Sequence, residues 1–238
     1  MESLKLPTNI EFNEREEDNT GEIVISPFEK GYGHTIANTY RRVLLSSLPG
    51  GAVESIKIED VQHEFSTVDG VLEDVVEIIL NTKDLAVKVH SDESVTLSLT
   101  ASGEGDVTAE EFEDNADVDI INPETKLFEI VDDSEIEMEI TVGQGRGYVQ
   151  AEEKDTEDWA LGKIAVDSHY SPIRNVGYDI EKTRVGDITD YDKATITVET
   201  NGTIDAQEAI EKANEILMNH FSLIDKAAKG EEISTEEE

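Results

Sequence analysis

The sequence predicts an α+β fold in which a β-rich domain is inserted into a discontinuous α/β domain. Strand and helix patterns at the start of the chain are matched by similar patterns at its end, and short alternating strands fill the stretch between them. Alternation with a period of two is typical of strands with one buried face, so we expect antiparallel sheets. We place the discontinuous domain at 1–48 and 167–228, the inserted domain at 49–166, and a disordered acidic tail at 229–238.

The N-terminal part of the chain predicts one strand followed by one helix. The apolar run Ile23-Val24-Ile25 indicates the strand, which ends at Ser26-Pro27. A glycine-rich turn then leads into a helix over about 34–48, which Pro49-Gly50-Gly51 ends. Helical spacing assigns its buried face to Ile36, Tyr40, Val43, Leu44 and Ser47.

The central part of the chain predicts a series of short strands and one short helix. The strands are expected at 53–61, 85–89, 95–99 and 136–142, with the helix at 71–80. The stretch 143–162 is rich in Gly and charged residues and has little periodicity, so we expect a long mobile loop there.

The C-terminal part predicts three strands and a strong helix. The strands are expected at 164–166, 176–180 and 194–198. Asp205 can cap the helix, and Glu208 completes a D-x-x-E capping box. The apolar stripe of this helix is too wide for a single buried seam. One side can therefore face its own domain, and the other requires a second partner.

The charge of the chain limits its partners. With 56 acidic and 19 basic residues, the formal net charge is -37, and such a surface repels phosphate backbones. We therefore expect no direct contact with nucleic acid. The even spread of the acids favours a role in solubility, with a docking face for basic partners as the alternative.

Several features indicate a cytoplasmic protein without a membrane span. The chain has no cysteine, which excludes disulfides and thiolate metal sites and fits a reducing compartment. No apolar run approaches the roughly 20 residues that a membrane helix needs. The polar and acidic N-terminus does not resemble a secretory signal.

Motifs for catalysis or cofactor binding are not found. No two of the five histidines have the spacing of metal ligands on a helix. The run Gly143-x-Gly145-x-Gly147 lacks the dinucleotide spacing, and a turn is the better interpretation. We therefore predict no catalytic residues, no metal site and no cofactor.

The helix at 34–48 carries the residues that most clearly suggest a binding surface. Asn38, Arg42 and Leu45 fall opposite its predicted buried face, with Arg41 at the edge. Adjacent arginines are unusual in a chain with 19 basic residues. They form either an ordinary solvated face or a docking face for the carboxylates of a partner, and composition does not decide between the two.

Four sequence blocks follow one another along the chain. The first is FEKGYGHTIANTYRRVLLSSLPG at 28–50. The second is VQHEFSTVDGVLED at 61–74 with IILNTK at 78–83, and the third is GRGYV at 145–149. The fourth is VDSHYSPI at 166–173 with ETNGTID at 199–205. Together they resemble, in the same order, the N-terminal region of the bacterial RNA polymerase alpha subunit, and because they span nearly the whole chain the resemblance is specific.

The resemblance implies a non-catalytic assembly subunit of DNA-directed RNA polymerase. In the family, two alpha chains pair through helices of the discontinuous domain, one protomer binds the beta subunit, and the other binds beta-prime, which holds the active site. The partners implied are thus a second copy of this chain, beta and beta-prime.

The resemblance also implies site residues. For the beta interface they are His34, Asn38, Arg41, Arg42, Ser171, Pro172 and Asn201. For the beta-prime interface they are Lys83 and Val166. For the dimer interface they are Leu45, Ile210, Leu217 and Ile224.

The chain departs from the family at its C-terminal end. The family continues through a flexible linker into a domain that binds promoter DNA, whereas this sequence stops at Glu238, in what resembles the start of that linker. Two other hypotheses stay open at this point. One is a stand-alone acidic protein-binding module, and the other is an enzyme with a carboxylate site.

Overall fold

The computed structural model describes residues 4–15 and 19–231 of the 238-residue chain. It has mostly antiparallel sheets and three α-helices, which confirms the predicted α+β class. The chain divides into two compact units, the first formed by Met1–Leu48 with Ile173–Glu238 and the second by Pro49–Pro172. Of the tail predicted at 229–238, the part from 232 onward lies outside the described residues.

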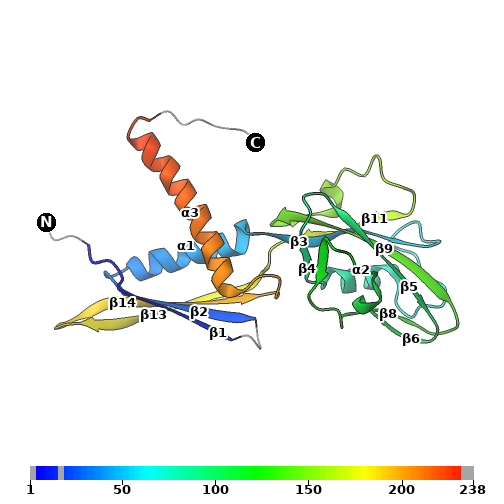
Figure 1. The fold of residues 1–238 in the computed structure, drawn as a ribbon, viewed down its shortest axis with the longest axis horizontal. Helices are drawn as coiled ribbons and strands as arrows, with labels where there is room; N and C mark the ends of the chain where they lie inside the picture. The colour runs from blue at the N-terminus through cyan, green and yellow to red at the C-terminus, as the bar shows by residue number, and fades with distance from the viewer. Residues whose placement is uncertain (1–3, 16–18, 232–238) are drawn as a thin grey trace. The chain divides into compact units, whose positions relative to one another are not determined.

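The first unit is built on a four-stranded antiparallel sheet with the order β1-β2-β14-β13 (Figure 1). These strands are β1 (Asn9–Arg15), β2 (Thr20–Phe28), β14 (Ile188–Thr200) and β13 (Ile173–Val185). Strands from the two ends of the chain lie side by side because β14 pairs with both β2 and β13. The start and the end of the sequence therefore share one sheet.

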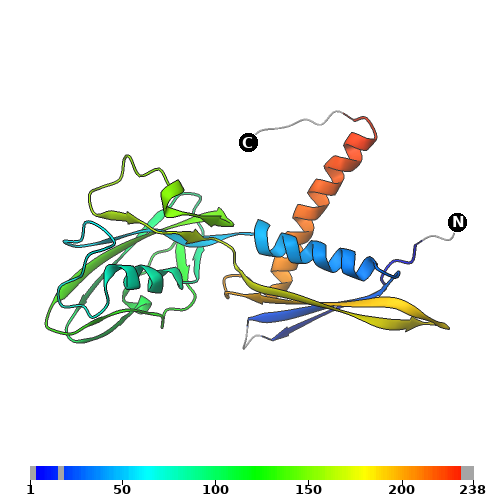
Figure 2. The ribbon, with the colours of Figure 1, turned by 180° about the vertical axis from the view of Figure 1, so that it is seen from behind.

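Two helices, α1 (Tyr32–Ser47) and α3 (Ala206–Ala228), lie on the same face of this sheet (Figures 1 and 2). The core between them and the sheet includes Ala37, Ile196 and Ala209, all with no exposed surface. The predicted start of α3 is confirmed, because the Asp205 carboxylate accepts a hydrogen bond of 2.6 Å from the Glu208 amide. The Glu208 side chain pairs with Lys212 instead of closing the capping box.

The buried face of α1 differs from the one predicted by periodicity. Leu44 is buried as predicted, but the other buried residues are Gly33 and Ala37, which were not predicted. The remaining residues predicted there are only partly buried: Ile36, Tyr40, Val43 and Ser47. Small side chains let the helix lie close to the sheet, and this contact has no strong hydrophobic signature in the sequence. The larger residues are turned toward the edges of the contact.

The second unit contains a four-stranded antiparallel sheet with the order β11-β3-β9-β5. These strands are β11 (Lys163–Ala165), β3 (Pro49–Ile58), β9 (Glu135–Arg146) and β5 (Val95–Ser102). Apolar residues of β3, β5 and β9 enter a core that also receives helix α2 (Val75–Lys83). The helix begins four residues later than predicted, because Asp74 caps it by accepting a 2.8 Å hydrogen bond from the Glu77 amide.

Short pairs of strands complete the second unit. They are β4 (Val87–Val89) with β7 (Val118–Ile120), β6 (Gly105–Thr108) with β8 (Lys126–Ile130), and β10 (Tyr148–Val149) with β12 (Ser168–His169). Two 3-10 turns, η2 (Ala109–Glu111) and η3 (Ala151–Glu153), lie between strands.

The loop predicted at 143–162 is wrong for its first part, because β9 continues through Gly143 and Gly145. The predicted turn is found only at Gly147, which follows the strand with a φ of 67°. A Cβ atom on Gly143 would lie 2.4 Å from the Glu54 carboxylate, and one on Gly145 would lie 2.8 Å from the Tyr170 ring. These glycines make room for neighbouring side chains within a strand, so they do not form a turn.

Candidate functional site

Helix α1 presents a polar face to solvent. His34, Asn38, Arg41 and Arg42 are all exposed, which agrees with the side predicted to lie opposite the core. Within residues 4–15 and 19–231, no salt bridge involves either guanidinium. Two adjacent planar cations with free donors are suited to binding carboxylates in a bidentate manner. Leu45, which was predicted on the same outer side, is instead half-buried and packs against the core.

The other residues expected at the same interface are less accessible. Ser171 and Pro172 are buried in the second unit. Asn201 lies in the first unit, half-buried in the turn before α3, and its side-chain oxygen accepts hydrogen bonds from the amide and hydroxyl of Thr203. The main structural role of the Asn201 side chain is therefore to stabilise that turn. The four exposed α1 residues therefore form the accessible part of the predicted set.

A second polar centre lies in the second unit around Asp167. Its carboxylate accepts from the Lys83 ammonium at 3.1 Å and from the Ala151 amide at 2.9 Å, and Tyr148 also donates to it. The hydrogen bonds from Ala151 and Lys83 hold the pKa of Asp167 at about 2. The Lys83 side chain is therefore held in place by Asp167. Tyr148, the other side chain bound to this carboxylate, is exposed.

Val166, the neighbour of Asp167, is buried in the core with 1% of its surface exposed. Its side chain can influence a partner only through the residues that it supports. Sequence reasoning missed Asp167 and Tyr148 as members of this centre. Both lie inside the blocks that carry the resemblance, but one carboxylate among 56 acidic residues gives no signal of its own.

The partly buried side chain of Lys154 links three neighbouring parts of the backbone in the second unit. Its ammonium donates to the Glu54 carbonyl at 2.8 Å, to the Val166 carbonyl at 2.5 Å and to the Ser168 hydroxyl at 2.6 Å. Burial lowers the pKa of Lys154, and burial together with Glu54 raises the pKa of Tyr170 to about 12. Lys154, which follows η3, thus links its segment to strand β3 through Glu54 and to the start of β12 through Val166 and Ser168.

The C-terminal half of α3 extends away from its own sheet (Figures 1 and 2). It carries exposed apolar residues. Of the predicted dimer residues, Ile210 is buried in the core of its own unit, Leu217 is half-buried, and Ile224 is 64% exposed. Three further apolar side chains of this half are also exposed: Met218, Phe221 and Leu223. An unpartnered apolar helix face of this kind is typical of an interaction surface.

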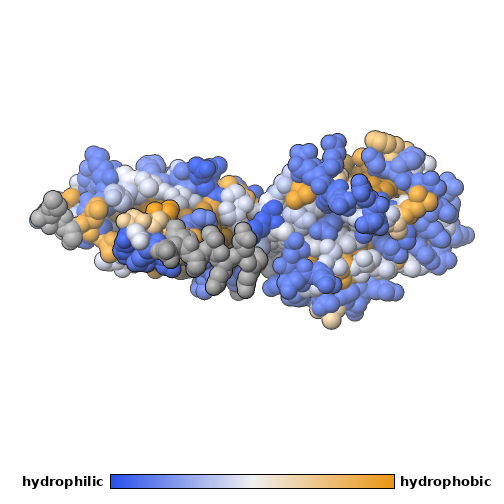
Figure 3. Space-filling view, turned by 90° about the horizontal axis from the view of Figure 1, so that it is seen from above, coloured by the Kyte–Doolittle hydropathy of each residue, from blue (hydrophilic) through white to orange (hydrophobic). Residues whose placement is uncertain are grey.

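An apolar groove of about 370 Å³ lies at the N-terminal end of α1 in the same unit. It is lined mainly by apolar side chains from the N-terminal segment, β2 and α1, including Leu6, Ile10, Phe28, Tyr32 and Ile36. Leu6 is 76% exposed and Ile10 is 55% exposed. In Figure 3, apolar residues interrupt a surface that is otherwise largely hydrophilic.

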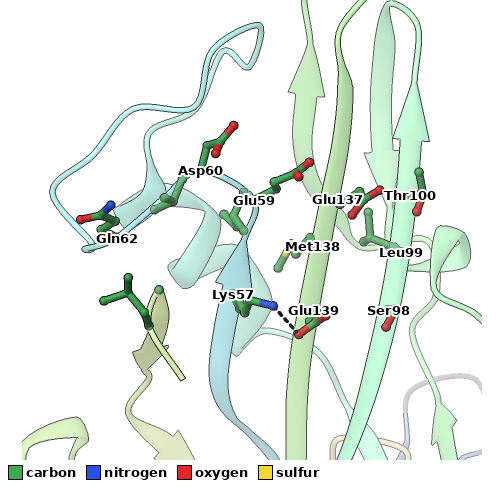
Figure 4. A pocket seen from close by; sticks show the side chains of 14 residues that line it. Lys57, Glu59, Asp60, Gln62, Ser98, Leu99, Thr100, Glu137, Met138 and Glu139 are labelled. Carbon is green, nitrogen blue, oxygen red and sulfur yellow. Dashed lines mark hydrogen bonds and ion pairs between the residues drawn. The ribbon is translucent and has the colours of Figure 1, made fainter. Parts of the chain in front are cut away.

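A hollow of about 470 Å³ on the sheet of the second unit is polar (Figure 4). It is lined by Glu59, Asp60 and Glu137, and Lys57 is paired with Glu139 at 3.3 Å. Among the described residues, no group of three or more His, Asp or Glu side chains is arranged to hold a metal ion. None of the helices in the described part of the chain is long and apolar enough to cross a membrane.

The chain is similar to known proteins of one family. A family model described as the RNA polymerase Rpb3/RpoA insert domain matches residues 56–171. Three similar proteins carry the name DNA-directed RNA polymerase subunit alpha. The one from Desulforamulus reducens is 51% identical over 90% of this chain and 68% of its own length. The one from Symbiobacterium thermophilum is 52% identical over 87% of this chain and 66% of its own length. The one from Carboxydothermus hydrogenoformans is 49% identical over 93% of this chain and 72% of its own length. The chain thus spans about two thirds of these relatives.

Proposed function

This chain belongs to the family of bacterial DNA-directed RNA polymerase alpha subunits, and we propose that it acts as the non-catalytic scaffold on which that polymerase is assembled. Two copies pair through the first unit. The pair then offers α1 to the beta subunit on one protomer and the surface around Lys83 to beta-prime on the other. Nucleotidyl transfer takes place on the partners, in the cytoplasm.

The exposed, unpaired arginines of α1 carry this proposal. Arg41 and Arg42 have no salt-bridge partner among the described residues, although the chain has 56 acidic and 19 basic residues. Arg146 and Arg174 are likewise exposed without a salt bridge in the described part of the chain. Arg41 and Arg42, however, are adjacent on one exposed helix face and can bind the same partner. A guanidinium that becomes desolvated against a partner carboxylate at the centre of an interface typically contributes about 2 kcal/mol or more to binding. Arg42 is therefore the residue expected to contribute most to beta binding.

Dimerisation is supported by two apolar surfaces that one chain leaves open. The exposed half of α3 presents Phe221 and Ile224, and the groove beside α1 presents Leu6 and Ile10. Removing a large apolar side chain from water contributes roughly 1.5–3 kcal/mol. Several such side chains on each of two copies are enough to drive association, so we propose these surfaces as the dimer interface together with Leu45 and Leu217.

The proposed beta-prime interface is the surface formed by Lys83, Asp167 and Tyr148. Lys83 is about one quarter exposed and its charge is already paired with Asp167. Val166 supports this surface from the core beneath it. The beta-prime subunit would therefore meet a pre-organised ion pair with an exposed Tyr148 at its side, at a lower entropic cost than a mobile lysine would require.

The two units correspond to two proposed roles. The first unit is the discontinuous dimerisation and assembly domain, and the second is the inserted β-rich domain. With a net charge of -37, neither unit is expected to bind nucleic acid directly.

Affinity measurements with alanine variants test the beta docking face. Arg42→Ala is expected to weaken binding to the beta subunit of the same organism at least 30-fold, the equivalent of about 2 kcal/mol. Arg184→Ala is the matched control, because Arg184 lies in the same unit but is engaged with Asp187 and the Gly186 carbonyl at the end of β13. Equal affinities for wild type and Arg42→Ala would rule out this docking face.

A further inference from the structure

Helix α1 begins without a cap of its own. Its N-cap residue is Gly31, whose φ of 85° lies in the left-handed region, and no side chain caps the helix from this position. The first turn of α1 also lacks an acidic residue. The first amides of a helix need acceptors, and the N-terminus favours negative charge, so some other group must satisfy this end.

Asp192 supplies that acceptor from strand β14. Its Oδ2 atom accepts a 2.7 Å hydrogen bond from the Gly31 amide, 161 residues earlier in the chain. The Gly33 amide donates to the same carboxylate. Only 2% of Asp192 is exposed, so water cannot replace it in this role.

The glycine spacing of the turn fits this contact. Gly31 adopts a positive φ that other residues rarely take. A Cβ atom on Gly33 would lie 2.9 Å from the Asp192 Cβ and 3.3 Å from its Oδ2. Gly33 therefore allows the carboxylate to approach the start of the helix, and the two glycines are explained by one interaction.

Lys182 compensates the buried charge. Its ammonium lies 2.8 Å from Asp192 Oδ1 and 3.2 Å from Asp190, which in turn pairs with Lys30. Burial alone would raise the pKa of Asp192, but the bonds from Lys182 and Gly31 outweigh it and hold the pKa below its usual value. The carboxylate is thus ionised, and both of its oxygens have partners.

We propose that Asp192 is a positioning residue for the α1 docking face, acting as the helix cap from a separate strand. This inference rests on the proposed function, because it concerns the same beta interface. The capped turn fixes where the helix starts on the sheet and how it is rotated. His34, Asn38 and Arg42 follow within three turns of the capped end, so their directions depend on that start.

The test compares Asp192→Asn with Asp190→Asn in the full chain. The asparagine keeps the shape but loses the charge and one acceptor, whereas Asp190 is an exposed carboxylate two residues away on the same strand. For Asp192→Asn we expect amide hydrogen exchange at Gly31 and Gly33 to rise about tenfold or more, and beta affinity to fall about tenfold, with the dimer intact. Asp190→Asn should leave the affinity and both exchange rates within twofold of wild type.

Three outcomes would overturn the positioning role. The first is unchanged exchange at Gly31 and Gly33 in Asp192→Asn. The second is equal acceleration throughout β2 and α3, which would indicate general destabilisation. The third is unchanged beta affinity in Asp192→Asn beside a loss in Arg42→Ala. Unchanged affinity in Arg42→Ala would instead overturn the docking face itself, and the positioning role with it.

A measurement on the wild-type chain keeps the inference testable if Asp192→Asn does not fold. The first amides of a helix ordinarily exchange quickly because they have no partner within the helix. Slow exchange at Gly31 and Gly33, comparable to that of the strand β14, is expected if the buried carboxylate holds them. Fast exchange at both amides would overturn the inference.

Discussion

Lys83 and Asp167 form an ion pair with 3.1 Å between Nζ and Oδ2, which joins the end of α2 to the residue that follows the buried Val166. Lys83 and Val166, the two positions expected to act in beta-prime binding, are thus linked through Asp167, which pairs with Lys83 and follows Val166 in the chain. The ion pair explains how a buried valine and a surface lysine can affect the same surface, because both fix the position of Asp167.

The Asp167 carboxylate should make stability depend on acid pH. Its pKa of about 2 is depressed by Ala151 and Lys83 relative to roughly 3.9 in an unfolded chain. A group depressed on folding stabilises the fold above its unfolded pKa, and this contribution is lost as the pH falls through the folded pKa. The advantage of wild type over Asp167→Asn in free energy of unfolding should therefore be largest above about pH 4 and shrink toward pH 2.

Urea titrations followed by the fluorescence of Trp159, the single tryptophan of the chain, measure this difference in the second unit. Asp187→Asn serves as the control, because Asp187 is fully exposed. A difference between wild type and Asp167→Asn that stays constant from pH 5 to pH 2 would contradict the assignment.

Charge on the exposed face of α3 should dissociate the dimer. Leu217, Phe221 and Ile224 follow one another at helical spacing, and Phe221 is 57% exposed in the single chain. Phe221→Glu places a carboxylate in the proposed interface of both copies, where it is desolvated without a partner. Sedimentation at micromolar concentration should show the variant near 26.3 kDa. Leu161→Glu, at an 85% exposed leucine of the second unit, should leave the mass at that of the dimer.

Removing the Lys154 ammonium should loosen the segment around η3. Lys154→Met keeps most of the apolar stem but leaves the Glu54 and Val166 carbonyls without this donor. We expect a loss of about 1–3 kcal/mol in the stability of the second unit, and faster proteolysis within 150–162. Lys193→Met removes a partly exposed lysine that pairs with Glu181 at the surface and should cost less than about 1 kcal/mol. Equal protease resistance of wild type and Lys154→Met would contradict the role of this lysine.

A methyl group at Gly145 should be costly. Its Cβ would lie 2.8 Å from ring atoms of Tyr170, whose hydroxyl is held by Glu54. We expect Gly145→Ala to destabilise the second unit by about 1–3 kcal/mol in thermal unfolding, because the ring has to move. At Gly177, also in a strand, an added Cβ meets nothing within 4 Å, so Gly177→Ala should be neutral or slightly stabilising. Similar effects for both variants would show that the contact with Tyr170 does not matter.

The sequence was sufficient for the α+β class, the three helices and the exposed side of α1. Strongly periodic segments such as α3 and the 136–142 part of β9 carry their own signal, and the Asp205 cap marked the start of α3. The resemblance added the family, which similarity over most of the chain then showed.

Features that depend on neighbours distant in sequence could not be predicted. The buried face of α1 relies on Gly33 and Ala37, which have no hydrophobic signature. Strand β9 passes through glycines that looked like a loop, because Glu54 and Tyr170 fill the space that they leave. Asp167, Lys154 and Asp192 acquire their roles only when strands and turns far apart in the chain are brought together.

The mass of the complex formed with the beta subunit tests the scaffold most directly. Light scattering of the wild-type chain alone should give twice 26.3 kDa, and addition of beta should give a complex of two copies of this chain with one beta. Arg42→Ala should keep the doubled mass but form no complex at the same concentrations. A wild-type chain that stays monomeric, or a single copy bound to each beta, would contradict the account.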